Sequence, residues 1–250
     1  MKTTFQPIAV AFTILIAASF SSCKKSDVNT QSTSGSVISE RNNLISYLFP
    51  PTARPYGKTY GYWAAAWWKW DFTSDCASNP ILDPDGSFQN QNQSGNVYFL
   101  AGSIGGTATR NVTIPAGKGI FFPLVNTLND YPCPDTSFHP SQGQSLKDFL
   151  TAGTDAIISQ VDSLSMTIDG NTLSNPFDFR ATSPPFNFTG NTDLVNCLDP
   201  CITGNQQRGV GDGYWIMLRP LSAGTHVLHF TSGISAYGFS IDLTYNITIQ

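Results

Sequence analysis

The chain has 250 residues, of which 40% are hydrophobic and 12% charged, and its formal net charge is -4. A chain of this length can bury one sizeable core, and all-β folds often use the whole length for a single domain. Because it has no basic stripe to neutralise a phosphate backbone, nucleic acid is excluded as an expected partner.

The N-terminal residues indicate export. Lys2 precedes an apolar run from Ile8 to Phe20, which is too short to span a bilayer comfortably and is typical of a secretory signal. We therefore predict a signal peptide over residues 1–22. Small residues lie just before Cys23 and resemble the lipobox of bacterial lipoproteins, in which cleavage leaves that cysteine N-terminal and lipid-modified.

Lipid attachment at Cys23 predicts a membrane-anchored lipoprotein of the bacterial cell envelope, with an ordinary cleaved signal or a membrane anchor as the alternatives. Each buried methylene of an acyl chain contributes about 0.8 kcal/mol, so several chains hold a protein on a membrane. Between Cys23 and Val37 the single apolar side chain is Val28, and residues 23–42 cannot offset the entropy of their own ordering. We expect a flexible tether there, followed by one folded domain over residues 43–250.

The stretch YGYWAAAWWKWD, from Tyr60 to Asp71, predicts an aromatic helix near residues 58–71. At 100° per residue, one stripe of this helix is apolar and should be buried against a sheet; the stripe contains Tyr60, Trp63, Ala64, Trp67 and Trp70. Trp68 falls on the flank and Tyr62 lies opposite. These two side chains should stay free to meet a sugar ring or a partner.

The segment after this helix predicts a polar turn. Asp83-Pro-Asp85-Gly86 presents two carboxylates before a glycine, but it lacks the further ligands of a calcium-binding loop of the EF-hand type. We interpret it as a turn, followed by an exposed polar loop over residues 89–93.

Most of the remaining chain predicts short strands separated by turns. The expected strands cover residues 97–101, 110–114, 119–125, 164–168, 214–218, 225–230 and 239–249. A hairpin is expected at Asp169-Gly170, and a return strand should follow the proline and glycine turn after residue 114. Only one further helix is expected, over residues 145–161 with Ser145 as its cap. The fold class is therefore all-β, a β-sandwich or jelly-roll with one or two helices packed on it.

Several blocks of the sequence carry a resemblance. They are NVYFLAGSIGGTATRNVTIPAGKGIFFPLVN at residues 96–126, FRATSPPF at 179–186 and DGYWIMLRPLSAGTH at 212–226, with a terminal strand at 241–249. In this order they resemble an uncharacterised family of bacterial exported proteins and lipoproteins. The family has no established activity, so the resemblance implies a fold and no catalytic residues.

Four cysteines remain once Cys23 is set aside, an even number that predicts disulfides in an exported protein. Three pairings are open. Cys197 and Cys201 are close enough to pair locally across a proline turn, which would leave Cys76 with Cys133. Zinc is the competing reading, but no histidine lies near either pair. We therefore expect no metal, and since no cofactor-binding motif is present we expect no cofactor.

The sequence holds no recognisable catalytic motif. His226 and His229 lie three apart on an expected strand, so they should point to opposite faces. Hydrolysis by a carboxylate pair stays open, with Asp130, Asp178 and Asp212 as candidate members. A buried arginine needs an acidic partner, so we interpret Arg180 and Asp212 first as a structural pair and second as a site for an anionic sugar.

These observations favour a cell-envelope lipoprotein whose sandwich binds a ligand or partner, with a glycan or an envelope protein as candidates, rather than an enzyme. The residues expected to bind the ligand are Trp68, Tyr62, Arg180 and Asp212. A hydrolase or lyase acting on polysaccharide is the first alternative, and a structural component of an envelope assembly is the second. Fold alone does not rank these three functions.

Overall fold

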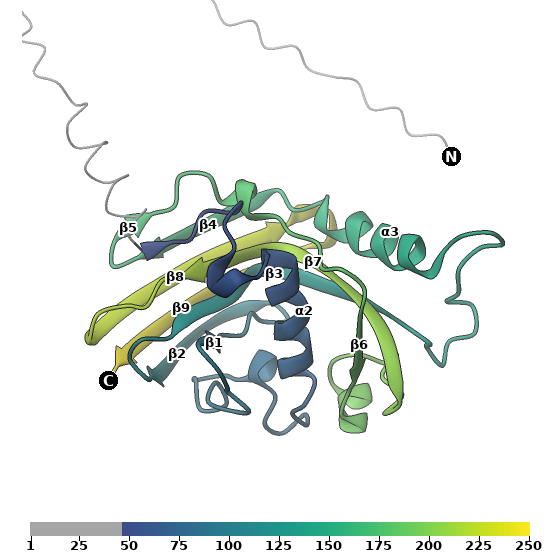
Figure 1. Ribbon diagram of the computed structural model, residues 1–250, viewed down its shortest axis with the longest axis horizontal. Helices are drawn as coiled ribbons and strands as arrows, with labels where there is room; N and C mark the ends of the chain where they lie inside the picture. Colours follow the sequence, from purple (N-terminus) through teal and green to yellow (C-terminus); the bar gives the residue numbers. More distant parts are fainter. Residues whose placement is uncertain (1–46) are drawn as a thin grey trace, which may run out of the picture. The chain divides into compact units, whose positions relative to one another are not determined.

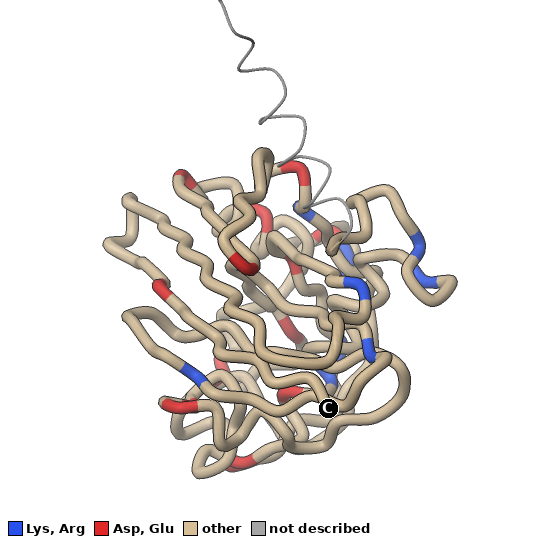
Figure 2. Tube along the Cα trace, turned by 90° about the vertical axis from the view of Figure 1, so that its left-hand side faces the viewer, with Lys and Arg blue, Asp and Glu red and all other residues tan. Residues whose placement is uncertain are grey.

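Two β-sheets and two α-helices make up the domain, as the all-β prediction required (Figure 1). The structure, a computed structural model, describes residues 47–250. The predicted signal peptide, the lipid-attachment residue Cys23 and the tether at 23–42 lie outside the described residues. Basic and acidic positions are scattered along the described chain between long uncharged stretches (Figure 2).

Sheet A has four strands in the order β1-β3-β7-β6. Strand β1 (Val97–Phe99) runs parallel to β3 (Gly119–Tyr131). Strand β3 pairs antiparallel with β7 (Gln206–Leu218), which pairs antiparallel with β6 (Phe186–Thr189). The two longest strands of this sheet, β3 and β7, therefore lie at its centre.

Sheet B has five strands in the order β2-β9-β8-β4-β5. Strand β2 (Gly106–Ile114) runs parallel to β9 (Phe239–Ile249). The other neighbours are antiparallel: β9 with β8 (Gly224–Ile234), β8 with β4 (Ser163–Ile168), and β4 with β5 (Asn171–Thr172). The C-terminal strand is thus enclosed between two neighbours.

Local sequence signals explain the strands and turns but not their partners. The predicted hairpin forms, and its turn residues Asp169 and Gly170 have φ angles of 49° and 77°, the left-handed region that Asp and Gly tolerate. The expected return strand at Gly119 also forms. It does not pair with β2, however, because β3 joins sheet A while β2 joins sheet B. The chain crosses between the sheets at this turn.

The two helices begin where capping residues predict. Helix α2 (Tyr60–Asp71) is capped by Thr59, and α3 (Leu146–Ile158) by Ser145, whose hydroxyl accepts a hydrogen bond from the Asp148 N–H. Both helices contact β3 and β7. Within residues 47–250, none of the helices has the length and apolar character needed to cross a bilayer. Short 3-10 helices cover Pro55–Gly57, Pro80–Leu82, Pro176–Phe179, Thr192–Asn196 and Ser235–Tyr237.

Sheet A is the middle layer, and its apolar strand residues are covered on both faces. Phe121 stacks on Trp215 of β7 with ring centroids 5.3 Å apart, and Trp215 in turn meets Trp67 of α2. The next residue, Phe122, contacts Phe230 of β8 in sheet B. Successive strand residues point to opposite faces. Phe121 therefore packs toward α2 and Phe122 toward sheet B, so these two neighbours connect the helix and both sheets.

The aromatic stripe of α2 is buried largely as predicted. Tyr60, Trp67 and Trp70 are each 5% exposed or less, whereas Trp63 is half-buried. Tyr62 is 44% exposed, as expected for the opposite face. Trp68 contradicts the prediction, because only 7% of it is exposed. Its burial has a specific cause in strand β7, described below.

Candidate functional site

A cavity of about 410 Å³ lies between α2, the second half of β3 and the loop around residue 199. We call it the Trp68 cavity. Its volume is in the range of small-ligand sites, and its wall mixes aromatic rings with a few polar groups. The lining includes Trp68, Phe72, Asn126, Asp130, Phe138 and Asp199.

A row of glycines on β7 lies opposite the β3 residues that line this cavity. Asn126, Leu128 and Asp130 alternate along β3, and β7 places a glycine opposite each of them. These are Gly213, Gly211 and Gly209, in that order. A Cβ at Gly211 would lie 2.5 Å from the Trp68 Nε1 atom, so only glycine allows the indole to lie on the strand. The bare backbone explains why Trp68 is buried and not exposed.

The Trp68 indole N–H has no hydrogen-bond partner among residues 47–250, although the atom is buried. The other tryptophans differ, because each of their indole N–H groups donates to a backbone carbonyl at 2.7 to 3.1 Å. The buried Nδ2 of Asn126 is likewise unpartnered within the described chain. Leaving a buried donor unsatisfied costs roughly 1 to 3 kcal/mol, and both residues line one cavity.

Two carboxylates, Asp130 and Asp199, meet at the same cavity and form what we call the carboxylate pair. Their side chains offer oxygens within 4.8 Å of one another. Asp130 is 3% exposed and accepts a hydrogen bond from the Gln207 amide, and Asp199 accepts one from the Cys201 N–H at 2.8 Å. Sequence reasoning named Asp130 as a carboxylate candidate, but with Asp178 and Asp212, which lie elsewhere.

The electrostatics of the pair follow from burial and proximity. Burial raises the pKa of Asp130 to about 7, and the negative charge of Asp199 adds to the increase. Burial also raises the pKa of Asp199, while the hydrogen bond from Cys201 opposes that change. Two carboxyls this close do not both ionise readily, so the pair holds a proton near neutral pH.

The cysteine beside the carboxylate pair is not available as a metal ligand. Cys201 lies within 4.8 Å of both carboxylates, but its sulfur is bonded to Cys133 and offers no thiolate. The Gln207 amide group already donates to one Asp130 oxygen. Of the three clustered side chains, only the two carboxylates could therefore ligate an ion.

Both disulfides hold the loop that carries Asp199. The four cysteines pair as disulfides, which confirms that part of the prediction, but the expected pairing was wrong: Cys76 bonds Cys197 and Cys133 bonds Cys201. Closeness in sequence suggested a local bridge. Instead, the two ends of the loop are tied to separate elements, the segment after α2 and the end of β3.

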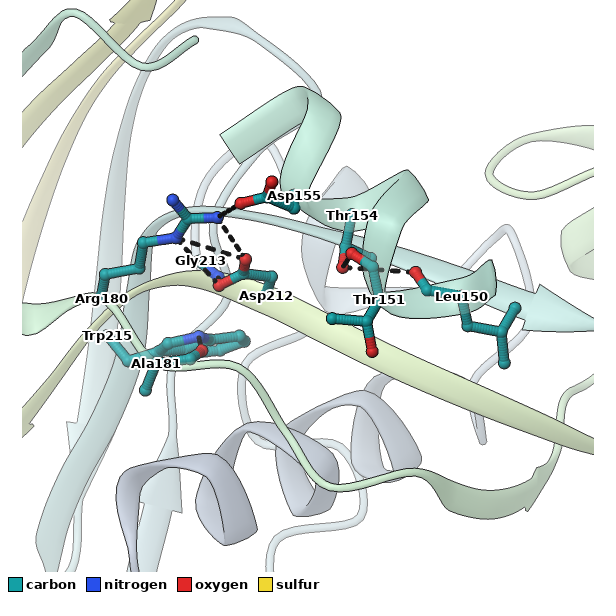
Figure 3. A network of polar contacts seen from close by, with 9 residues as sticks. All are labelled: Leu150, Thr151, Thr154, Asp155, Arg180, Ala181, Asp212, Gly213 and Trp215. Atoms are coloured by element: carbon teal, nitrogen blue, oxygen red, sulfur yellow. Dashed lines mark hydrogen bonds and ion pairs between the residues drawn. The ribbon is translucent and has the colours of Figure 1, made fainter. Parts of the chain in front are cut away.

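Arg180 and Asp212 form the predicted structural pair (Figure 3). The guanidinium Nη2 lies 2.6 Å from Asp212 Oδ2 and 2.7 Å from Asp155 Oδ1, and thereby joins β7 to α3. The hydrogen bond to Asp212 is the main cause that raises the pKa of Arg180. Neither residue lines the Trp68 cavity.

Arg110 departs from the expectation that a buried arginine needs an acidic partner. Arg110 is 1% exposed and donates to the carbonyl oxygens of Ile81, Asp83 and Gly102 and to the hydroxyl of Tyr245. Carbonyl acceptors therefore satisfy it. These bonds fix the two loops that bring residues 81 and 103–104 to the cavity wall.

The polar loop over residues 89–93, after the turn at Asp83, was predicted to be exposed. It is partly buried instead. Gln89 is fully buried, and its side chain bonds the Pro80 carbonyl, the Asp83 carboxylate and the Ala101 N–H. Asp83 accepts hydrogen bonds from the N–H groups of its own turn, including that of Gly86 at 2.8 Å. The Tyr245 hydroxyl also donates to Gln89 Oε1 at 3.3 Å, so this network includes a contact far along the chain.

A serine, a histidine and an aspartate also meet, which the sequence did not predict. His226 Nδ1 lies 2.6 Å from Asp169 Oδ2, and Nε2 lies 2.9 Å from the Ser222 carbonyl oxygen but 3.5 Å from its hydroxyl. Two acceptors make the imidazole a donor at both nitrogens, so it offers no base to the serine. His229 is turned to the exposed face and contacts Asp242 instead, as the strand pattern required.

A second cavity of about 410 Å³ lies on the other side of α2, lined by Trp63, Trp70 and residues 94–97. Both indole N–H groups there are already bonded to carbonyl oxygens. Tyr62 lies outside both cavities, with the Lys58 ammonium 4.8 Å from its ring centroid. The Trp68 cavity is therefore the better candidate, since its polar groups still lack partners.

Comparisons with known proteins add little to this geometry. No family model and no curated protein matches the chain. A solved structure described as PbICP-C in complex with falcipain-2 matches 62% of this chain and 100% of its own, at 10% identity and a TM-score of 0.24. A score this low supports no inference about fold or function.

Proposed function

We propose that the protein is an exported envelope lipoprotein that binds a glycan in the Trp68 cavity without cleaving it. The observation that carries this proposal is the pair of unpartnered donors, Trp68 Nε1 and Asn126 Nδ2, on one aromatic-lined wall. Both donor atoms are buried, so the two side chains must shift before sugar hydroxyls can accept from them. The apolar faces of a sugar ring suit the neighbouring aromatic side chains.

Two features support the proposed location in the cell envelope. Two disulfides are typical of an exported protein in an oxidising compartment. The lipobox-like residues before Cys23 support lipid attachment there. Labelled palmitate should enter the wild-type protein and fail to enter a Cys23→Ala variant. Labelling of that variant, or none of the wild type, would contradict the anchor.

Binding is tested by screening the mature chain, extracted in detergent, against a glycan array and measuring the affinity of each positive glycan by calorimetry. Trp68→Phe keeps a ring but removes the unpartnered N–H, so it should weaken binding about tenfold with little effect on stability. Trp63→Phe is the matched control. It removes an N–H that donates to the Pro55 carbonyl, so it should lower stability by about 1 kcal/mol and leave affinity unchanged.

Hydrolysis is the second candidate, because the carboxylate pair has the chemistry of a general acid and its partner. Retaining glycosidases hold two carboxyl groups about 5 to 5.5 Å apart, and the acid needs a raised pKa such as that of Asp130. Burial of Asp130 and its bond to Gln207 favour binding over catalysis. Release of shorter sugars, abolished in Asp130→Asn and Asp199→Asn, would establish the enzyme instead.

A further inference from the structure

We propose that the ligand of the Trp68 cavity carries a protonated amine, and that its class is an amino sugar or an oligosaccharide containing one. This inference rests on the proposed function and names the ligand class of the same site. It follows from three properties of the cavity wall: its uncompensated acidic groups, its aromatic rings and its unpartnered donors.

The ionisable side chains that line the Trp68 cavity are all acidic. The carboxylate pair lines the cavity, and among the described residues no Lys, Arg or His does so. Elsewhere in the fold Asp212 has Arg180 and Asp169 has His226 as cationic partners, whereas the buried Asp71 and Asp83 accept hydrogen bonds from neutral groups. A buried negative charge without a partner is costly, so a cationic ligand would supply the missing counter-charge.

The aromatic wall favours the same ligand. Trp68, Phe72, Phe138 and Phe239 line the cavity together with the carboxylate pair. Aromatic faces attract ammonium groups by about 0.5 to 2 kcal/mol, and most strongly where water is excluded. Acidic and aromatic groups together therefore select a cation over a neutral group of similar shape.

The unpartnered donors exclude a simple amine as the whole ligand. Trp68 Nε1 and Asn126 Nδ2 need acceptors, which an ammonium group does not offer. On β3, Asn126 and Asp130 lie four residues apart, or roughly 13 Å along an extended strand. A ligand that serves both ends of the wall therefore carries hydroxyl or ether oxygens at one end and an ammonium group at the other, as an amino sugar chain does.

Binding of such a ligand should release a proton. Burial and Asp199 keep Asp130 partly protonated near neutral pH. An ammonium group placed beside the pair favours the carboxylate form, so the carboxyl proton passes to the buffer while the ammonium keeps its own. Asp199 is the charged group that faces Asp130 here; β7 contributes the neutral Gln207, and α2 the neutral Trp68.

The test is calorimetry at pH 5.5, where the sugar amines are protonated, with the mature chain in detergent and two matched probes, a tetrasaccharide of 2-amino-2-deoxyglucose and its fully N-acetylated form. Each is titrated in two buffers that differ in ionisation enthalpy, which reports protons released. We expect the free amine to bind at least about tenfold tighter and to release a fraction of one proton. Asp199→Asn, which keeps the oxygen bonded to Cys201, should reduce that preference, and urea unfolding shows whether the variant is still folded.

The outcomes separate this inference from the function it rests on. Equal affinity for the two probes, without proton release, would overturn the cationic ligand and leave glycan binding standing. Failure of both probes and of every glycan on the array would overturn glycan binding itself. A preference that survives undiminished in Asp199→Asn would place the ammonium away from the carboxylate pair and also contradict the inference.

Discussion

Gly211 of β7 lies directly against the indole of Trp68, so close that a Cβ at this glycine would sit 2.5 Å from the ring nitrogen. The contact explains how a tryptophan on the flank of α2 becomes buried while its N–H stays unpartnered. A side chain at this position would push the ring, and the helix with it, away from the sheet. The glycine therefore sets the position of Trp68, and with it that of α2.

Gly211→Ala should destabilise the domain by about 1 to 3 kcal/mol, because the added methyl group overpacks this contact. It should also weaken glycan binding, since Trp68 moves. Urea unfolding checks the first effect and calorimetry the second. Gly102→Ala is the control: a Cβ there meets its nearest atom at 3.4 Å, so its cost should be under 1 kcal/mol. Equal costs for the two variants would contradict the tight contact.

Removing the disulfide between Cys133 and Cys201 should lower stability and binding together. The bridge closes 68 residues and the bridge from Cys76 to Cys197 closes 121, so chain entropy predicts a loss of about 4 to 5 kcal/mol for either. Serine pairs at each bridge, compared by thermal unfolding, should give similar shifts. If neither pair lowers the melting temperature, the two bridges do not constrain this fold.

The buried carboxyl of Asp130 should make the domain less stable as pH rises from about 4 to about 7. The folded protein holds a proton there that the unfolded chain has released, because the pKa is about 7 when folded and 3.8 when unfolded. The slope from one such group is at most about 1.4 kcal/mol per pH unit. Burial also raises the pKa of Asp71 to about 7, so Asp71 adds to this decrease of stability with pH.

Asp130→Asn should therefore flatten this pH dependence, and the slope that persists should come from Asp71, Asp199 and His226, whose pKa values are also raised. Urea unfolding at pH 5, 6, 7 and 8 measures both. A variant whose stability falls with pH as steeply as that of the wild type would show that Asp130 is ionised when buried.

His226 should stabilise the domain at low pH and lose this effect as pH rises. Burial alone would lower the pKa of the imidazole, but the hydrogen bonds to Asp169 and to the Ser222 carbonyl, together with the charge of Asp169, raise it. The stabilisation is complete below the unfolded pKa of about 6.5 and is lost as pH passes the higher folded value. Proton NMR titration of His226 should show a raised pKa that Asp169→Asn lowers. An unchanged pKa in that variant would contradict the pairing.

Asp212→Asn should cost about 2 kcal/mol or more, because it leaves the partly buried Arg180 without its main partner. Asp155→Ala removes an acceptor that is 61% exposed and should cost under about 1 kcal/mol. Neither change should alter glycan affinity, since neither residue lines the Trp68 cavity. If Asp212→Asn lost glycan binding without losing stability, Arg180 and Asp212 would have to be part of the glycan site.

Local patterns predicted the elements whose residues interact with near neighbours. The alternation over residues 239–249 matches strand β9, and the capping residue Ser145 marks the start of α3. The aromatic periodicity of residues 60–71 likewise predicted α2 and most of its buried stripe. These signals lie within one turn or one strand, so they can be read directly from the sequence.

The candidate site depends on long-range contacts, which is why the sequence did not predict it. Asp199 meets Asp130 only because two disulfides carry its loop to the end of β3. Its position between two cysteines, in Cys197-Leu-Asp-Pro-Cys201, was the available signal. The alternate glycines from Gly209 to Gly213 were another, since bare positions along a strand indicate close approach by another element.

The indole N–H signals in a ¹H–¹⁵N NMR spectrum test the central claim most directly, because the five tryptophans give five separate reporters. When the mature protein is titrated with an oligosaccharide that contains amino sugars, the Trp68 signal should move downfield as its N–H gains an acceptor. The four indoles already bonded to carbonyl oxygens should move far less. A bound ligand that leaves the Trp68 signal in place, or that shifts Trp63 and Trp70 instead, would contradict the assignment of this cavity.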